Sequence, residues 1–120
     1  MKNSVNVLGT EYKIEVVKIS ECDELKENNW AGNCNKITKI ILIGDASEEE
    51  FFGKMTKDEQ EEVTKQILRH EITHAFFNES GLQESCLQYR GGWAVNEEMV
   101  DWIALQFPKM QKAFEEVGCL

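Results

Sequence analysis

The sequence predicts an α+β fold in which a small antiparallel or mixed sheet of about three strands packs on two long helices. From Glu11 to Ile19, apolar and charged side chains alternate with period two, the pattern of a half-buried strand. A second strand is predicted from Ile37 to Ile43, which ends in an unbroken apolar run. Apolar residues then recur at helical spacing from Thr56 to about Asn78 and from Val95 to about Val117.

The first 43 residues also contain segments whose secondary structure is less clear from the sequence. Residues from Met1 to Gly9 carry too little pattern to assign, and the polar stretch from Glu21 to Asn29 is predicted to be a short helix or an exposed loop. A short strand around Trp30 to Cys34 is expected to pair with Ile37 to Ile43 as a hairpin. The run from Ile40 to Ile43 is expected to be buried on both faces.

A short helix is predicted directly after the strands. Ser47 with Glu50 three residues later has the form of a capping box, in which each side chain bonds the backbone of the other. The helix is expected to run through Phe52, and Gly53 would end it.

The first long helix has clear start and stop signals. Thr56 with Glu59 three residues later opens it, and Gly81 lies just beyond its end. Its polar residues concentrate in the first half, so the helix is expected to enter from solvent and become buried further along.

The second long helix carries a broad apolar stripe that is expected to lie in the core. Pro108 lies within this helix, lacks a backbone N–H and crowds the Ala104 carbonyl, which predicts a kink or a helix that stops and restarts. A glycine-containing connector from Ser80 to Trp93 precedes it. The stripe comprises Val95, Met99, Trp102, Ile103, Met110 and Phe114.

Length and charge restrict the function classes. A chain of 120 residues and 13.8 kDa corresponds to one domain, residues 1–120. The net charge of −9 and the pI near 4.7 disfavour binding to nucleic acid or to anionic membranes, so a protein or peptide partner is expected. The chain has no run of about 18 uncharged apolar residues and no signal pattern, which favours a cytoplasmic protein.

The cysteines do not form a zinc-binding pattern. They are widely spaced and include no C-x-x-C pair, so ordinary reduced thiols are expected. An even number leaves a secreted two-disulfide framework as the alternative. The four residues are Cys22, Cys34, Cys86 and Cys119.

The most specific motif is the H-E-x-x-H sequence from His70 to His74, inside the first long helix. Residues four apart share one face of a helix, so His70 and His74 can offer two imidazoles to one zinc ion. Glu71 would lie beside them, next to the water that such an ion activates. The alternative is a pair of hydrogen-bonded histidines without a metal. The chain contains no other histidine.

Glu97 is the predicted third ligand, because a catalytic zinc site takes three protein ligands and leaves a fourth position for water. Without a third histidine, the metzincin pattern is excluded and carboxylates remain, with a thiolate as a weaker candidate. Asp101 lies about 40° from Glu97 around a helix, and both border its apolar side. Glu98 lies about 100° from Glu97, on the expected solvent face, and is the second candidate.

Asp101 is predicted to orient a ligating histidine, because such a ring usually donates its second N–H to a carboxylate. His70 is the expected partner. The alternative interpretation of Glu97 and Asp101 is a solvated acidic helix face.

With these residues the chain resembles the gluzincin metallopeptidases, which pair H-E-x-x-H with a glutamate on a downstream helix. The N-E-x-x-x-D pattern of Asn96, Glu97 and Asp101 matches that group's ligand and orienting positions. The segment from about Trp30 to Pro108 looks especially like the small phage and mobile-element metallopeptidases of the ImmA/IrrE type. The resemblance implies a zinc metalloendopeptidase whose substrate is a peptide or protein, with a transcriptional repressor as one candidate.

The expected mechanism is hydrolysis by a water that zinc activates and Glu71 deprotonates. Tyr89, Arg90 or Tyr12 could stabilise the oxyanion. The strand from Ile37 to Ile43 could bind an extended peptide if it edges the cleft. The alternative function is a regulatory or partner-binding protein that keeps a zinc-stabilised fold without turnover.

Overall fold

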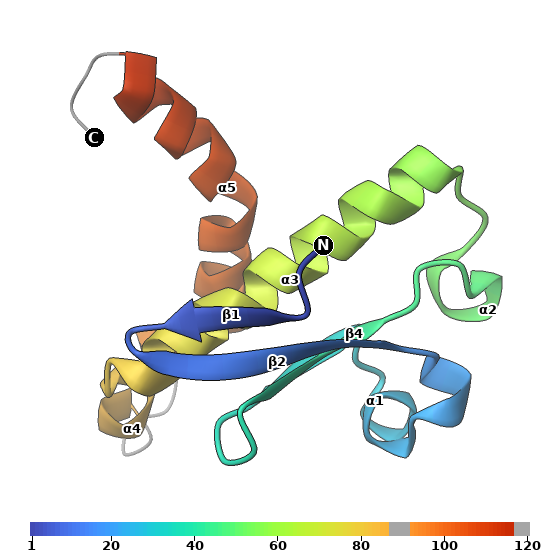
Figure 1. Cartoon of the computed structure of the whole chain (residues 1–120), viewed down its shortest axis with the longest axis horizontal. Helices are drawn as coiled ribbons and strands as arrows, with labels where there is room; N and C mark the ends of the chain where they lie inside the picture. The colour runs from blue at the N-terminus through green and yellow to red at the C-terminus, as the bar shows by residue number, and fades with distance from the viewer. Residues whose placement is uncertain (87–91, 117–120) are drawn as a thin grey trace.

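The computed structural model describes residues 1–86 and 92–116 and has the predicted α+β fold. Helix α3 (Lys57–Glu79) crosses one face of the sheet, and α5 (Glu97–Glu116) packs against α3 and then projects away from it (Figure 1). The strands are β1 (Ser4–Val7), β2 (Thr10–Val17), β3 (Gly32–Asn35) and β4 (Ile40–Gly44). Their order is β1-β2-β4-β3; the central β2 and β4 run parallel, and both outer pairs are antiparallel.

Strand β1 is the element that the sequence pattern did not reveal. It joins β2 through a two-residue turn in which Leu8 and Gly9 have φ values of 51° and 93°. Positive φ at both central residues is typical of the tight turns whose twist matches that of the flanking strands. Leucine rarely adopts this conformation, so the pair lacks the Asn-Gly or Asp-Gly signal by which such turns are recognised.

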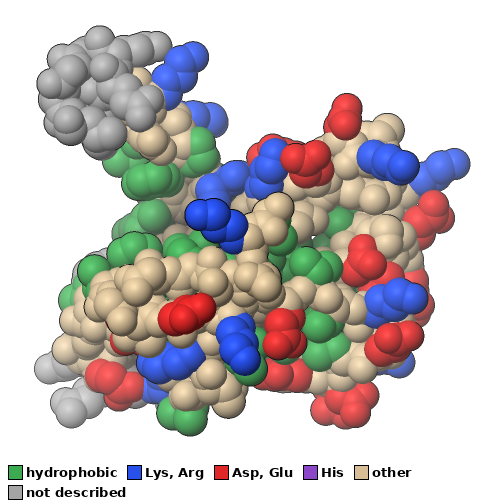
Figure 2. All heavy atoms as spheres, in the orientation of Figure 1, with side chains coloured by type: hydrophobic (Ala, Val, Ile, Leu, Met, Phe, Trp, Pro, Cys, Tyr) green, Lys and Arg blue, Asp and Glu red, His purple; other side chains and the backbone are tan. Residues whose placement is uncertain are grey.

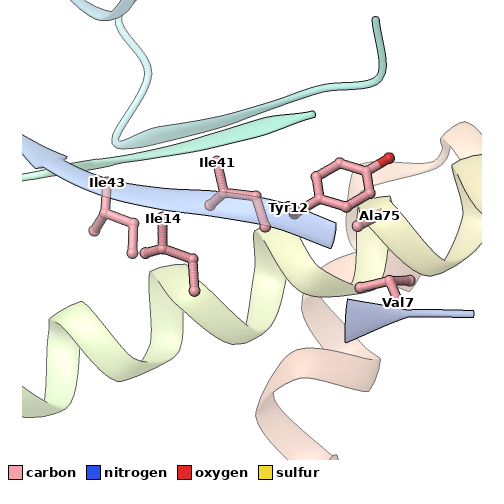
Figure 3. Close-up of a cluster of buried hydrophobic side chains, with 6 residues drawn as sticks. All are labelled: Val7, Tyr12, Ile14, Ile41, Ile43 and Ala75. Atoms are coloured by element: carbon pink, nitrogen blue, oxygen red, sulfur yellow. The ribbon is translucent and has the colours of Figure 1, made fainter. Parts of the chain in front are cut away.

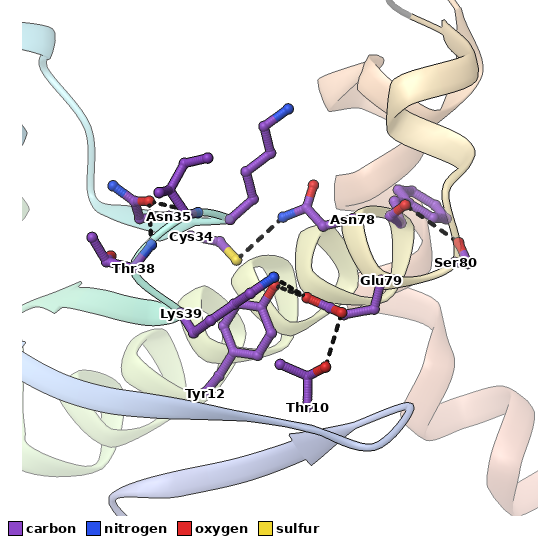
Figure 4. A network of polar contacts seen from close by, with 12 residues as sticks. Thr10, Tyr12, Cys34, Asn35, Thr38, Lys39, Asn78, Glu79 and Ser80 are labelled. Carbon is purple, nitrogen blue, oxygen red and sulfur yellow. Dashed lines mark hydrogen bonds and ion pairs between the residues drawn. The ribbon is translucent and has the colours of Figure 1, made fainter.

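The predicted hairpin is present as β3 and β4, but β4 begins at Ile40 rather than at Ile37. The side-chain oxygen of Asn35 accepts hydrogen bonds from the backbone N–H groups of Ile37, at 2.9 Å, and of Thr38, at 3.0 Å (Figure 4). These bonds curl the chain into a turn before the strand starts.

The main core lies between the sheet and α3, where apolar side chains of three strands meet the helix (Figure 3). Leu68 and Ile72 of α3 pack against this cluster, so α3 turns one face toward the sheet and leaves an adjoining face free for polar groups. The fully buried cluster consists of Val7, Tyr12, Ile14, Ile41, Ile43 and Ala75.

The expectation that Ile40 to Ile43 is buried on both faces is wrong. Ile41 and Ile43 are fully buried, whereas Ile40 and Leu42, on the face away from α3, are only half-buried. Val16 of β2 belongs to the apolar side of the predicted alternation from Glu11 to Ile19, but it is 52% exposed. Strand β1 pairs with β2 only as far as Lys13, so the end of β2 lacks that neighbour.

Two short helices lie near the ends of the central strands (Figure 1). Helix α1 (Asp23–Asn28) shows that the segment from Glu21 to Asn29 is helical, with Asn29 in the left-handed conformation at its end. Helix α2 (Glu49–Phe52) ends at Gly53, as predicted.

The predicted capping box at Ser47 and Glu50 is wrong. The residue that precedes α2 is Glu48, and its side chain does not cap that helix. Its carboxylate instead accepts a hydrogen bond from the backbone N–H of Ile19, at the start of a 3-10 helix (Ile19–Glu21). Glu48 therefore contributes to a long-range contact rather than to local helix capping.

The predicted start of the first long helix is confirmed. Thr56 and Glu59 form a capping box in which the Glu59 N–H donates to the Thr56 hydroxyl and the Thr56 N–H donates to the Glu59 carboxylate. The helix ends at Glu79, within a residue of the prediction.

Glu79 links the C-terminal end of α3 to the sheet through hydrogen bonds and an ion pair (Figure 4). Its carboxylate accepts hydrogen bonds from the hydroxyls of Tyr12, at 2.7 Å, and Thr10, at 3.0 Å, and it pairs with Lys39. The Lys39 ammonium, followed by the Tyr12 hydroxyl, lowers the pKa of Glu79 from its ordinary 4.5 to about 2. This network sets the axial position of the helix that carries the histidines.

The predicted connector after α3 contains helix α4 (Leu82–Cys86) and a 3-10 turn η2 (Trp93–Val95). Helix α5 begins at Glu97 rather than Val95, and the side chain of Asn96 accepts a hydrogen bond from the Met99 N–H in its first turn. The helix continues through Pro108 without stopping, and its axis bends in Figure 1.

The expectation that the apolar stripe of α5 lies in the core is wrong for Met99, Trp102 and Met110, which are exposed. Val95 and Ile103 pack beside a core cluster, and the side chain of Phe114 lies outside the described residues. Val100 and Ala104 are buried and Ile103 is half-buried, but Trp102 is 53% exposed. Met99 and Met110 are also exposed, and hydrophobic side chains gather along the projecting part of α5 in Figure 2. Beyond its first turns, the helix projects away from the body of the fold (Figure 1). In the part of the chain that the structure describes, every helix is too short or too polar to span a bilayer.

The Glu79 network predicts a pH-dependent contribution to stability. The folded-state pKa is lowered to about 2, so the ionised carboxylate stabilises the fold above about pH 4.5, and this contribution is lost as the pH falls toward 2. Glu79→Gln should therefore lower the free energy of unfolding at pH 7, and the difference from wild type should shrink below about pH 4.5. Urea denaturation between pH 7 and pH 3 measures it, with exposed Glu11→Gln as control. A difference that stays constant over this range would contradict the role of the Glu79 charge.

Candidate metal centre

Helix α3 presents His70 and His74 on the face next to the one that packs on the sheet. Their Nε2 atoms are 3.1 Å apart, and the two rings meet edge to face with centroids 4.8 Å apart. Each side chain is about one fifth exposed, so the nitrogens lie near the surface without being fully solvated. The H-E-x-x-H spacing thus brings the two Nε2 atoms close enough to bind one ion, as the motif predicts.

Glu97, the first residue of α5, adds a carboxylate to the two imidazole nitrogens. Its Oε2 atom is 3.1 Å from Nε2 of His70, and its Oε1 atom is 3.3 Å from Nε2 of His74. Val100 and Ala104 are buried in the packing of α5, which places the start of that helix beside the histidines. A residue 23 positions downstream of His74 therefore meets both rings.

Asp101 orients His70 as predicted from the sequence. Its Oδ1 atom is 2.6 Å from Nδ1 of His70, close enough for a strong hydrogen bond. Because the carboxylate accepts, Nδ1 carries the proton and the Nε2 lone pair is directed toward Glu97 and His74. Burial lowers the pKa of His74, so this ring also favours its neutral form, which has a lone pair to offer.

The donor set fits a small divalent cation. Three ligands at the zinc distance of about 2.0–2.1 Å, arranged tetrahedrally, are about 3.3–3.4 Å from one another. The three observed separations between His70, His74 and Glu97 are 3.1, 3.1 and 3.3 Å. Two imidazole nitrogens and one carboxylate are also a ligand set that zinc prefers. These residues could therefore hold one metal ion with little movement.

Glu71 lies beside this set but in a different environment. A carboxylate oxygen of Glu71 and one nitrogen of each histidine lie within 4.8 Å of one another, so distance alone would admit it as a ligand. However, the side chain is only 5% exposed, and burial, with the nearby charges of Glu97 and Asp101, raises its pKa to about 7. A carboxyl group with a pKa near neutrality can both accept and release a proton, which suits a general base better than a ligand.

Gly32 of β3 makes room for Glu71. A Cβ atom at Gly32 would lie 2.8 Å from Oε1 of Glu71 and 2.8 Å from a methyl carbon of Ile67. Any larger side chain would therefore displace the carboxylate. Gly32 lies inside the strand predicted around Trp30 to Cys34, and a glycine inside a strand is a sequence signal of close approach by another group.

An open cleft of about 580 Å³ is lined by the histidines, Glu71, Glu97 and Asp101. Strand β3 forms its opposite wall, and Asn78 and Gln83 line it beyond His74. The strand expected to edge the cleft, Ile37 to Ile43, does not do so, because β4 is paired on both sides. The unpaired edge at the cleft belongs to β3.

A thiol and an amide form a second feature of the cleft that the sequence did not reveal. The Asn78 side chain, one turn beyond His74, donates to Sγ of Cys34 at 3.7 Å (Figure 4). Burial, with the nearby charge of Glu71, raises the pKa of Cys34 to about 12, so it remains a neutral thiol. Cys22 and Cys34 form no disulfide in the structure.

The remaining predicted residues do not join the centre. Glu98 is exposed and does not line the cleft. Tyr12 is buried in the core, where its hydroxyl binds Glu79, so the structure does not bring it to the histidines. Tyr89 and Arg90 lie outside the described residues.

Comparison of the chain with protein-family models gave no match, and comparisons with curated proteins and with solved structures gave no significant match.

The contact between Gly32 and Glu71 predicts the effect of one methyl group. Gly32→Ala should push the Glu71 carboxylate toward solvent, because the end of that side chain moves more easily than the backbone of β4. The fold should lose about 1–3 kcal/mol from overpacking. In the metal-free protein the pKa of Glu71 should fall from about 7 toward its ordinary value of 4.5.

Carboxyl NMR titration measures this pKa, and Gly44→Ala is the matched control. A Cβ at Gly44 would lie 2.7 Å from the Ile19 side chain, so it overpacks the sheet against Ile19 and not against Glu71. A Glu71 pKa that stays near 7 in Gly32→Ala would show that Gly32 does not hold the carboxylate in place.

Proposed function

We propose that this chain is a zinc-dependent metalloendopeptidase of the gluzincin type, which hydrolyses peptide bonds in a peptide or protein. The convergence of His70, His74 and Glu97 at separations of 3.1–3.3 Å carries the proposal. The buried Glu71 beside them favours catalysis, because a purely structural zinc site needs no such carboxylate. The resemblance of the motifs to the small ImmA/IrrE-type metallopeptidases supports the same conclusion.

Each residue has a distinct role in this proposal. His70, His74 and Glu97 hold the zinc ion, and Asp101 keeps His70 in the tautomer whose Nε2 can ligate. A bound zinc ion supplies Lewis acidity, which polarises the scissile carbonyl and lowers the pKa of water. Glu71 takes the proton from the attacking water and delivers it to the leaving amine. In the metal-free protein, burial raises the pKa of this carboxyl to about 7.

Strand β3 is the element best suited to bind the substrate. It is an edge strand of the sheet and lines the same cleft as Glu71 and the histidines. An extended peptide can add to such an edge through backbone hydrogen bonds, which brings its carbonyl groups past the catalytic residues. This mode accepts many sequences, as proteolysis of an unstructured protein segment requires.

The substrate class follows from charge and from the resemblance. The net charge of −9 disfavours nucleic acid and anionic lipid, which leaves proteins and peptides. The related small metallopeptidases make a transcriptional repressor the first candidate. Action on a repressor would place the protein in the cytoplasm.

A second function is a zinc-stabilised partner-binding protein without turnover. The exposed apolar side chains of α5, among them Trp102 and Phe107, favour an interaction role of this kind. This alternative also requires the metal but does not require Glu71 as a base, so the two functions differ in the effect of one substitution.

The proposed zinc ligands are tested by measuring the zinc content of the protein after purification and dialysis. Wild type should retain one zinc per chain, and Glu97→Ala should weaken zinc binding by at least about tenfold, because only two imidazoles remain. Glu98→Ala is the matched control, since it removes the neighbouring exposed carboxylate. Loss of zinc from Glu98→Ala with retention by Glu97→Ala would refute the assigned third ligand.

The catalytic role of Glu71 is tested by the isosteric change Glu71→Gln. This variant should retain zinc but cleave a mixture of random fluorescence-quenched peptides at least about 100-fold more slowly than wild type, because the proton acceptor is lost. Glu61→Gln, on the exposed face of α3, is the control. Equal turnover by Glu71→Gln would remove Glu71 from the mechanism, and zinc binding without cleavage by wild type would favour the partner-binding function.

A further inference from the structure

We propose that Arg69 is a positioning residue for the metal centre. Its guanidinium binds the backbone carbonyl that Pro108 leaves without a helical donor, and this bond holds α5, and with it Glu97, in register against α3. The inference rests on the metal site proposed above and extends it to a residue that touches neither the ion nor the substrate.

The first step concerns the Ala104 carbonyl. In a continuous helix this carbonyl would accept a hydrogen bond from the N–H of residue 108, but proline has no N–H. Helix α5 nevertheless continues through Pro108. Ala104 itself is only 2% exposed, so its surroundings offer little water to satisfy the carbonyl.

Helix α3 supplies a donor for the Ala104 carbonyl. The Nε atom of Arg69 donates to the Ala104 carbonyl at 3.0 Å. A second nitrogen of the same guanidinium contacts Glu62, one of the exposed acidic residues of α3, at 3.2 Å. The planar, permanently charged group can make both contacts at once, which an ammonium on a flexible chain does less well.

The second step concerns the geometry of attachment. Arg69 and His70 are neighbours on α3, and they bind positions 104 and 101 of α5, which are one helical turn apart. Two contacts one turn apart fix both the rotation and the axial position of a helix, whereas a single contact leaves rotation free. Because each residue of a helix advances by about 100°, a slip of one position would turn Glu97 away from both histidines.

The third step separates this role from a simple effect of charge. A cation beside the site repels a metal ion, so removing the charge of Arg69 would, by electrostatics alone, tighten zinc binding. If Arg69 positions α5, its removal weakens zinc binding instead. The two explanations therefore predict opposite signs.

The test compares Arg69→Met with Lys65→Met. Both substitutions remove one positive charge from α3 and keep an unbranched side chain, but Lys65 pairs with the exposed Glu61 of its own helix rather than with α5. Zinc affinity is measured by competition with a chromophoric chelator, and cobalt-substituted protein reports the ligand geometry by its visible spectrum. Arg69→Met should bind zinc about tenfold more weakly and alter the cobalt spectrum, while Lys65→Met should leave both unchanged. Unchanged or tighter zinc binding by Arg69→Met would overturn the proposal.

A second substitution separates positioning of α5 from satisfaction of the carbonyl alone. Pro108→Ala restores a backbone N–H within α5 that can bind the Ala104 carbonyl but adds no contact with α3, so Arg69→Met should still weaken zinc binding in the Pro108→Ala background. Zinc affinity that returns to the wild-type value in the double variant would show that Arg69 only satisfies the carbonyl and does not position α5.

Hydrogen exchange of the metal-free protein distinguishes failure of this inference from failure of the proposed function. The amides of residues 97–104 should exchange faster in Arg69→Met than in wild type. A wild-type chain that binds no zinc would refute the metal site, and these exchange rates would still decide the role of Arg69. Wild-type exchange rates in Arg69→Met would refute that role.

Discussion

The contact between α3 and the start of α5 is the constraint on which the site depends. Two histidines on one helix create half of a metal centre at no conformational cost beyond forming that helix. The other half must come from a separate element that is held at the right distance and rotation. The buried face of α5 packs against α3, and this packing places Glu97 beside both imidazoles and Asp101 beside Nδ1 of His70.

The sheet makes a second contribution, through the environment of Glu71. Strand β3 approaches α3 so closely at Gly32 that the Glu71 carboxylate is almost removed from solvent. This burial raises the pKa of Glu71 to about 7, while Asp101 and Glu97 remain largely exposed on the other side of the histidines. Carboxylates in one cleft thus have different environments, and this difference separates the proton carrier from the ligand and the orienting group.

Local patterns predicted most of the elements and the residues that meet at the site. Helical spacing related His70 to His74 and Glu97 to Asp101, and the Thr56 capping box set the start of α3. Both relations depend on residues a few positions apart, which a sequence displays directly. The relative placement of the two pairs depends on how α3 and α5 pack, and the sequence supported it only through a resemblance of motifs.

The features that sequence reasoning missed depend on contacts between distant residues. Gly32 meets Glu71, Arg69 meets Ala104, and Glu48 caps a 3-10 helix rather than α2. The apolar stripe of α5 was assigned to the core because periodicity shows which residues share a face, but not whether another element covers that face. The hairpin turn at Leu8 and Gly9 was missed because leucine at positive φ is uncommon.

The most direct test of the central claim is X-ray absorption spectroscopy at the zinc edge of zinc-loaded protein. If His70, His74 and Glu97 hold the ion, the spectrum should show two imidazole nitrogens and additional oxygen ligands at about 2.0–2.2 Å, with no sulfur. A zinc–sulfur distance of about 2.3 Å would place the metal on cysteine and contradict the proposed centre.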